Sequence, residues 1–135
     1  DYQHKLMRIG IKAAAYSDNH MQAIAASHLT NKDAAIGISH SGSSIDVVDA
    51  LKISKSRGAK TICITNYGKS PILKYSDIAL FTVSNETKYR IFGMASRIAQ
   101  LAILDSIYTY IALNNQQVGI EEIKRTEKAL QSKKY

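Results

Sequence analysis

The chain has 135 residues, 45% of them hydrophobic, and its 18 Lys and Arg against 11 Asp and Glu give a formal net charge of +7 at pH 7. A chain of this size forms one domain and buries roughly two-thirds of the surface that its unfolded state exposes. Its apolar runs are far shorter than the roughly 18 residues of a membrane span, and its first residues do not resemble a signal peptide, so we expect a cytoplasmic protein without membrane contact.

The first third of the chain predicts a helix, a strand and a second helix. Leu6 and Ile9 have helical spacing, and Gly10 can end that helix. The short apolar run at 11–16 favours a strand. Residues 17–29 join capping side chains to a helical apolar pattern, which predicts the second helix.

The middle of the chain alternates strands and helices. We expect strands at 34–39, 60–65 and 78–83, a helix at 44–57, and a short helix at 70–75 that opens with a serine and a proline. The residues of the 44–57 helix that we expect to face inward are Val47, Val48 and Leu51.

The C-terminal third predicts two helices, at 90–113 and 118–131, separated by Asn114 and Asn115. The first is apolar over more than one face, so a single sheet contact cannot bury it. We therefore expect it to form a self-associating interface, most simply a two-fold dimer. Its apolar residues are Ile98, Leu101, Ala102, Leu104, Ile107, Tyr108, Ile111 and Leu113.

Strands separated by helices predict an α/β domain with a parallel sheet and right-handed crossovers. Ligands of such sheets bind beyond the carboxyl ends of the strands. Four polar clusters follow predicted strands, at 18–20, 39–44, 65–66 and 84–86. We expect these clusters to converge on one rim of the sheet.

The cluster at 39–44 carries the strongest chemical signal. Its residues are Ser39, His40, Ser41, Gly42, Ser43 and Ser44. A strand that ends in this way brings hydroxyls, backbone N–H groups and the positive end of a helix dipole to one point, which suits a phosphate monoester. The segment has neither the Gly-Lys-Ser/Thr of a Walker A loop nor a G-x-G-x-x-G turn.

An ordinary serine-rich turn, with Ser44 as a helix N-cap, explains the same residues equally well on sequence grounds. For Gly42 we expect a positive φ or a close backbone approach. Asp46 falls in the first turn of the following helix, where a carboxylate complements the helix dipole.

The positive charge is concentrated in a span that holds no acidic residue. The basic residues of this span are Lys52, Lys55, Arg57, Lys60, Lys69 and Lys74. Three interpretations stay open: a solvated helix face, which we favour, steering of anionic ligands, and direct contact with nucleic acid. The single cysteine, Cys63, excludes an internal disulfide, and we expect it to be a buried core side chain.

Several motifs together resemble the SIS (sugar isomerase) domain family. Residues 38–46 have the form Ile-Ser-x-Ser-Gly-x-Ser-x-Asp, and Thr65-Asn66 followed by Ser70-Pro71 resembles the second characteristic segment of that family. The segments 86–90 and 96–101 are similar to the SIS domain of RpiR-type transcriptional regulators. The resemblance covers essentially the whole chain.

The resemblance implies a three-layer α/β/α sandwich with a parallel, flavodoxin-like sheet, and a single SIS domain over residues 1–135. The family begins this domain with a strand and a Gly-x-Gly-x-Ser turn, and the chain starts after that point. We therefore expect the first strand to be missing between 11–16 and 34–39, so that these two segments do not pair directly. The upstream helix-turn-helix domain of such regulators is expected to be absent as well.

In function, the resemblance implies an effector-sensing domain of a bacterial regulator of carbohydrate metabolism rather than an enzyme. The implied ligand is a phosphorylated sugar or amino sugar, and the implied assembly is a homo-oligomer, either a dimer or a tetramer. DNA would be bound only through the helix-turn-helix domain. No metal and no cofactor are expected.

By the same resemblance, residues 39–44 hold the phosphate, and His20, Glu86 and Arg90 contact the sugar. The family often has glutamine in place of His40, so we expect the His40 backbone N–H to serve while its ring contacts phosphate or faces solvent. The alternative is a phosphosugar aldose–ketose isomerase in which Glu86 moves a proton between carbons one and two and His20 assists. Catalytic residues are expected only under that alternative.

Overall fold

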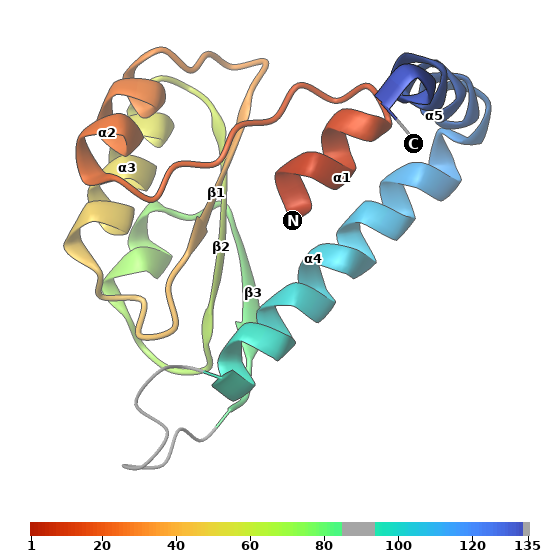
Figure 1. Ribbon diagram of the computed structural model, residues 1–135. Coiled ribbons are helices and arrows are strands. Elements are labelled where there is room, and N and C mark those ends of the chain that lie inside the picture. The colour runs from red at the N-terminus through yellow and green to blue at the C-terminus, as the bar shows by residue number, and fades with distance from the viewer. Residues whose placement is uncertain (85–93, 134–135) are drawn as a thin grey trace. The chain divides into compact units, whose positions relative to one another are not determined.

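The computed structural model describes residues 1–84 and 94–133 (Figure 1). Its strands are β1 (Ala34–Ile38), β2 (Lys60–Asn66) and β3 (Ile78–Thr82). Its helices are α1 (Tyr2–Arg8), α2 (Asn19–Ser27), α3 (Ile45–Ser56), α4 (Met94–Asn114) and α5 (Gln116–Leu130), with short 3₁₀-helices η1 (Pro71–Tyr75) and η2 (Gln131–Lys133). The chain forms two compact units, one of residues 16–101 and one of residues 1–15 with 102–135.

The first unit is built on a parallel sheet with strand order β1-β2-β3. Gly37 pairs with Cys63, and Cys63 pairs with Ala79, which fixes the register of all three strands. The α3 helix packs against β1 and β2, and α2 packs against α3 (Figure 1). The predicted α/β class and parallel sheet are confirmed.

The core of this unit lies between the sheet and α3. Leu51, Cys63 and Ile72 form its buried centre, and Val47 and Val48 pack against them. A Cβ added to Gly37 would lie 2.7 Å from Leu51 Cδ1, so the absence of a side chain there brings α3 close to the sheet. The prediction that Cys63 is a buried core side chain is confirmed.

The predicted helix ends follow from local chemistry. The Asp18 carboxylate accepts a hydrogen bond from the Met21 N–H and so caps α2. Gly10 and Gly58 follow α1 and α3 with φ values of +82° and +84°, the left-handed conformation that ends a helix at low cost. The short helix predicted at 70–75 is a 3₁₀-helix.

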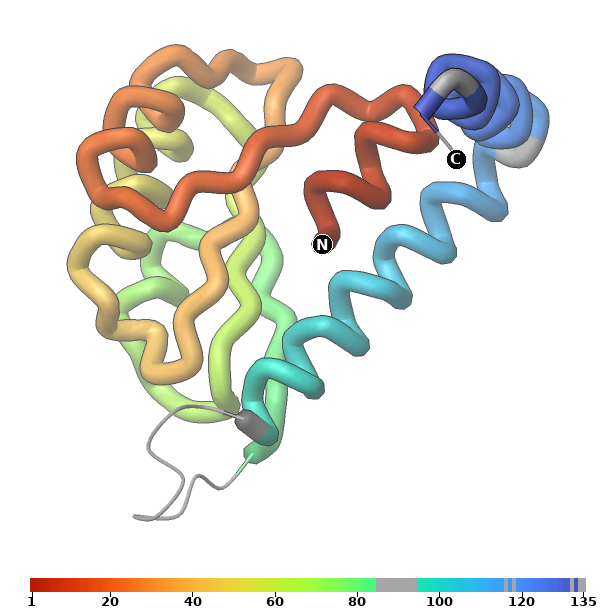
Figure 2. The backbone as a smooth tube through the Cα atoms, viewed as in Figure 1, coloured from red at the N-terminus to blue at the C-terminus, as the bar shows by residue number. Residues whose placement is uncertain are grey.

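One predicted strand is absent. Residues 11–16 form no strand and follow an extended path between α1 and α2 (Figure 2). Backbone N–H and C=O groups form a strand only where a neighbouring strand offers partners, and none pairs with this segment. The expectation that 11–16 and β1 do not pair directly is confirmed.

The second unit is helical. It contains α1, α5 and the greater part of α4, and two of its ion pairs join Lys5 Nζ to Asp105 Oδ1 at 2.6 Å and to Asp1 Oδ2 at 2.9 Å. Leu6 and Leu104 are buried. The predicted helices at 90–113 and 118–131 are confirmed over the described residues, while residues 90–93 lie outside them.

The long helix α4 exposes much of its apolar surface. Its exposed large apolar side chains are Ile98, Leu101, Tyr110 and Leu113. This agrees with the predicted surplus of apolar surface on the helix. No described helix is both long enough and apolar enough to cross a membrane.

Candidate functional site

The turn between β1 and α3 is held by the hydroxyl of Ser39. The Ser39 N–H donates to the Ile64 carbonyl at 3.1 Å and so continues the sheet ladder beyond β1. The Ser39 Oγ accepts a hydrogen bond from the Gly42 N–H at 3.1 Å and shares another with Ser44 Oγ at 2.9 Å. Ser39 is buried, so its hydroxyl lies inside the turn and stabilises it through these hydrogen bonds.

Gly42 occupies the tightest point of this turn. Its φ of +62° lies in the left-handed region, and a Cβ there would lie 2.6 Å from Ser70 Cβ and 2.8 Å from Thr65 Oγ1. Its carbonyl accepts a hydrogen bond from the Ile72 N–H at 3.0 Å, which ties the turn to η1. Both expectations for Gly42, a positive φ and a close approach, are confirmed.

Ser41 and Ser43 form the exposed side of the turn. Ser41 Oγ accepts hydrogen bonds from the Ser43 N–H at 3.2 Å and from Ser43 Oγ at 2.9 Å. A serine hydroxyl has one proton and two lone pairs, so these two bonds leave the Ser41 proton to be donated outward. The pair therefore presents a hydroxyl donor at the surface of the turn.

The first turn of α3 has backbone donors without a partner among the described residues. The first intrahelical bond runs from the Val48 N–H to the Ser44 carbonyl, so the N–H groups of residues 45–47 have no acceptor within the helix. Ser44 is the N-cap, but its side chain makes no capping hydrogen bond because it bonds Ser39 instead. Free N–H groups at the positive end of a helix dipole bind anions.

The carboxyl ends of β2 and β3 join this turn. The His40 carbonyl accepts hydrogen bonds from the Asn66 N–H at 3.0 Å and from Thr65 Oγ1 at 3.3 Å. The Ser84 N–H donates to Asn66 Oδ1 at 3.1 Å. Three of the four polar clusters expected at one rim are thus linked by hydrogen bonds, over their described residues.

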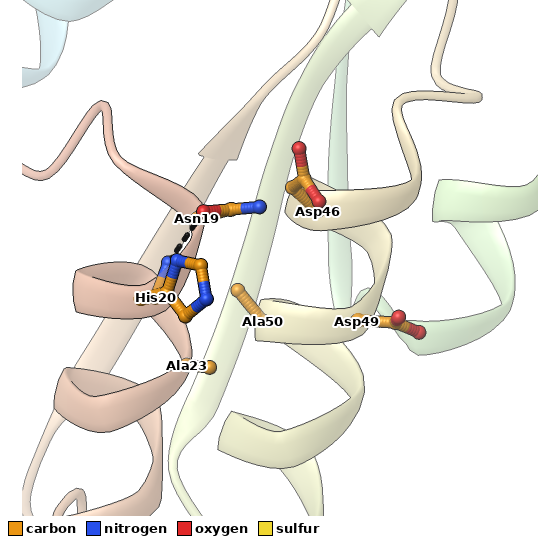
Figure 3. A pocket seen from close by; sticks show the side chains of 6 residues that line it. All are labelled: Asn19, His20, Ala23, Asp46, Asp49 and Ala50. Atoms are coloured by element: carbon orange, nitrogen blue, oxygen red, sulfur yellow. Dashed lines mark hydrogen bonds between the residues drawn. The ribbon is translucent and has the colours of Figure 1, made fainter.

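The fourth cluster, at 18–20, lies at the start of α2. His20 lines an open pocket of about 170 Å³ between the first turns of α2 and α3 (Figure 3). The structure thus places His20 beside α3 and shows no hydrogen bond from it to the 39–44 turn. Glu86 and Arg90, the other predicted sugar contacts, lie outside the described residues.

Three buried polar atoms near the turn have no hydrogen-bond partner among the described residues. They are His40 Nδ1, Ser70 Oγ and Ser84 Oγ. A buried polar group left without a partner costs about 1–3 kcal/mol, so such atoms are expected to be met by a ligand or water in the working protein. Ser70 was not among the predicted site residues, and Ser84 was expected at this rim only as part of the polar cluster at 84–86.

The sequence did hold a signal for Ser70 and Ser84. Each follows the carboxyl end of a strand, where the site of a parallel sheet lies. Ser70, the serine with which the predicted short helix opens, is the N-cap of η1, but its side chain makes no capping bond. Among the described residues, no group of three or more His, Cys, Asp and Glu side chains is arranged to hold a metal ion.

Comparisons with known proteins agree with one another. A family model described as the SIS domain matches residues 1–110. An uncharacterized HTH-type transcriptional regulator of Caldanaerobacter subterraneus is 39% identical over 99% of the chain and 48% of its own length. The HTH-type transcriptional regulator RpiR of Escherichia coli K12 is 39% identical over 89% of the chain and 41% of its own length.

Among solved structures, the NanR protein of Vibrio vulnificus in complex with ManNAc-6P matches 96% of this chain with a TM-score of 0.86 and 24% identity. The chain covers 48% of that NanR chain. It therefore spans about half the length, or less, of these relatives.

Proposed function

The chain belongs to the SIS domain family, and we propose that it is the phosphosugar-binding, effector-sensing domain of an RpiR-type transcriptional regulator of carbohydrate metabolism. The observation that carries this proposal is the turn at 39–44. It presents helix N–H groups and a hydroxyl proton that have no partner among the described residues, at the carboxyl end of β1. That donor set suits the oxygens of a phosphate monoester.

In this proposal the residues of the turn divide into two roles. Ser41, Ser43 and the N–H groups at the start of α3 contact the phosphate. Ser39, Gly42 and Ser44 give the turn its shape through the bonds that they make within it. The His40 side chain, whose Nδ1 is buried without a described partner, completes the phosphate site.

For the sugar we propose contacts from His20, Glu86 and Arg90. Support for His20 is its place at the carboxyl end of the sheet unit, in a pocket shared with α3. Glu86 and Arg90 rest on the family resemblance alone. The NanR structure with ManNAc-6P supports a phosphorylated sugar as the class of ligand.

We propose that the effect of the ligand is transmitted through a homo-oligomer to a helix-turn-helix domain, the part that would bind DNA. A ligand shifts such an assembly only if it binds two arrangements with different affinity. The exposed apolar side chains Ile98 and Leu101 on α4 are the proposed interface. Light scattering at high micromolar concentration is expected to show a dimer or tetramer, and a monomer would contradict this part of the proposal.

The function is tested by a thermal-shift screen of sugar phosphates. A ligand that binds only the folded state stabilises it by about 2.7 kcal/mol at 100 times its dissociation constant, so the melting temperature rises. We expect one or more sugar phosphates to raise it, and the same sugars without phosphate to leave it unchanged. Equal shifts by a sugar and its phosphate would refute the phosphate site.

A further inference from the structure

The pocket between α2 and α3 has a chemistry different from that of the phosphate-binding turn. It is lined by Asn19, His20 and Ala23 from α2 and by Asp46, Asp49 and Ala50 from α3 (Figure 3). Its volume of about 170 Å³ is below the roughly 300–1,000 Å³ of pockets for drug-sized ligands. A body the size of a single sugar ring suits it better than a nucleotide does.

The pocket adjoins the proposed phosphate site along α3. Asp46 comes two residues after Ser44, so it belongs to the same helical turn whose free N–H groups would meet the phosphate. One turn of α-helix rises only about 5.4 Å. A ligand held by its phosphate at the start of α3 therefore has its remaining atoms within reach of Asp46.

The two carboxylates of the pocket are oriented differently. In Figure 3, the Asp46 side chain lies on the side of α3 that faces Asn19, whereas the Asp49 carboxylate points away from both Asn19 and His20. No described residue donates a hydrogen bond to the Asp46 carboxylate, while Asn19 Oδ1 already accepts one from the His20 N–H at 2.8 Å. Asp46 is thus the negative acceptor that this pocket offers to a ligand.

We propose, resting on the phosphosugar function above, that Asp46 determines which sugar phosphates the site accepts. Its carboxylate accepts a hydrogen bond from a hydroxyl or ammonium group of the ligand. It also repels a second anionic group on the ligand, because like charges a few ångströms apart repel even through water. The ligand is therefore a phosphomonoester with a neutral or cationic body, not a phosphorylated sugar acid or a bisphosphate.

Calorimetry with four probes tests this inference on the wild-type chain and on Asp46→Asn. The first probe is inorganic phosphate, which has no sugar. The other three are glucose 6-phosphate, whose sugar is neutral, glucosamine 6-phosphate, whose sugar is cationic, and 6-phosphogluconate, whose sugar part is anionic. We expect wild type to bind 6-phosphogluconate more weakly than the other two sugar phosphates. Asp46→Asn should raise the affinity for 6-phosphogluconate relative to glucose 6-phosphate by about threefold to tenfold and lower that for glucosamine 6-phosphate by a similar factor.

Asp49→Asn is the matched control, because it removes the same charge from the same helix one turn further on, and the Asp49 carboxylate points away from Asn19 and His20 and so does not meet the ligand (Figure 3). It should change these affinity ratios less than twofold. A melting curve of Asp46→Asn without ligand checks the fold, and Asp46→Ser, which keeps a residue suited to a helix start, serves as the second variant if the first is unstable.

The outcomes separate the two proposals. If inorganic phosphate and all three sugar phosphates fail to bind, the phosphosugar function is wrong and this inference falls with it. If the sugar phosphates bind but none more tightly than inorganic phosphate, or if Asp46→Asn and Asp49→Asn change the ratios equally, the role of Asp46 is wrong while the function stands.

Discussion

The amino ends of the three strands form one side of the sheet, the amino edge, and their carboxyl ends form the opposite side, the carboxyl edge. The polar groups of these two edges differ in whether they have partners within the described chain. At the amino edge, Asp77 Oδ2 accepts hydrogen bonds from the Thr61 N–H at 3.0 Å and from Thr61 Oγ1 at 3.1 Å, and Asp77 Oδ1 pairs with Lys55 Nζ at 3.0 Å. Asp33 Oδ2 likewise accepts bonds from the N–H and the hydroxyl of Thr30. These side chains find their partners within the chain.

At the carboxyl edge, comparable polar groups stay without partners. Ser70 Oγ, Ser84 Oγ and His40 Nδ1 are buried and meet no described partner, and the N–H groups of residues 45–47 in α3 have no acceptor in the described part of the chain either. A fold that needed only stability has no reason to leave donors unpaired at one edge while it pairs them at the other. Over the described residues, this difference supports the proposal that the carboxyl ends of the strands are arranged to bind a ligand.

The largest effect is expected from Gly42→Ala. A side chain at φ +62° is strained by about 1–2 kcal/mol, and its Cβ would also collide with Ser70 and Thr65. The turn must then open, so we expect phosphate binding to weaken by more than about 100-fold in calorimetry. Gly119→Ala is the control, since the nearest atom to its added Cβ is 3.9 Å away, and it should leave binding unchanged. Normal binding by Gly42→Ala would show that the turn geometry is not needed.

Ser41→Ala and Ser44→Ala come next. Each should weaken binding of a sugar phosphate by about 1.5–3 kcal/mol. Ser41→Ala removes a direct hydrogen bond to the charged phosphate, whereas Ser44→Ala acts through the shape of the turn, because the Ser44 hydroxyl bonds that of Ser39 at 2.9 Å. Ser56→Ala is the matched control, because its hydroxyl bonds the Ile53 carbonyl at the far end of the same helix. If calorimetry finds that Ser41→Ala and Ser44→Ala bind as tightly as wild type, as the control should, the turn does not bind phosphate.

A smaller effect is expected at the amino edge, and it concerns stability alone. The hydrogen bond from the Thr61 N–H, together with Lys55, lowers the pKa of Asp77 from 3.8 to about 2. Because folding lowers the pKa of Asp77, its ionised carboxylate stabilises the fold at pH values above the ordinary pKa of 3.8. This contribution to the stability is lost as the pH falls from about 4 toward 2. Asp77→Asn should lack this part of the pH dependence.

Urea unfolding at several pH values between 2 and 6 measures the pH dependence of stability for the wild-type chain and for Asp77→Asn. The two stability curves should converge as the pH falls through that window, and sugar phosphate binding at neutral pH should be the same in both. Parallel curves would mean that Asp77 is not held as its bonds indicate.

The smallest effect is expected from Glu86→Gln. An effector domain needs Glu86 only as a hydrogen-bond acceptor, so binding should weaken by a few-fold. No aldose–ketose interconversion is expected. An isomerase also needs a group that stabilises the enediolate oxygen, and no catalytic motif assigns His20 or Arg90 to that role. Incorporation of deuterium from solvent into carbon two of a bound sugar phosphate, abolished by Glu86→Gln, would instead support the isomerase.

The sequence was sufficient for the elements whose signals are local. Apolar periodicity located β1, β2, β3 and the helices. The positive φ of Gly42 and the position of the serine-rich turn at the carboxyl end of β1 were also predicted correctly. Residues 11–16 were mispredicted because an apolar run becomes a strand only when a neighbour pairs with it, and pairing is not a local property.

The sequence signalled that Ser70 and Ser84 follow the carboxyl ends of strands, but which buried atoms lack a partner was not predictable, for a similar reason. Whether the hydroxyls of Ser70 and Ser84 find partners depends on side chains brought together by the fold, not on their neighbours in the chain. The same holds for the pocket that joins His20 to Asp46, since these residues come from different helices. The position of the serine-rich turn at the carboxyl end of β1 was predictable, while its role as a phosphate site stays a prediction.

The contrast between the two edges is tested most directly by following backbone amides with NMR while a sugar phosphate is added. We predict that the amide signals of residues 41–47 shift together and saturate with one affinity. The amides of Thr61 and Asp77, whose N–H groups are already bonded within the chain, should stay in place. Shifts centred on the amino edge, or equal shifts caused by the sugar without its phosphate, would contradict the account.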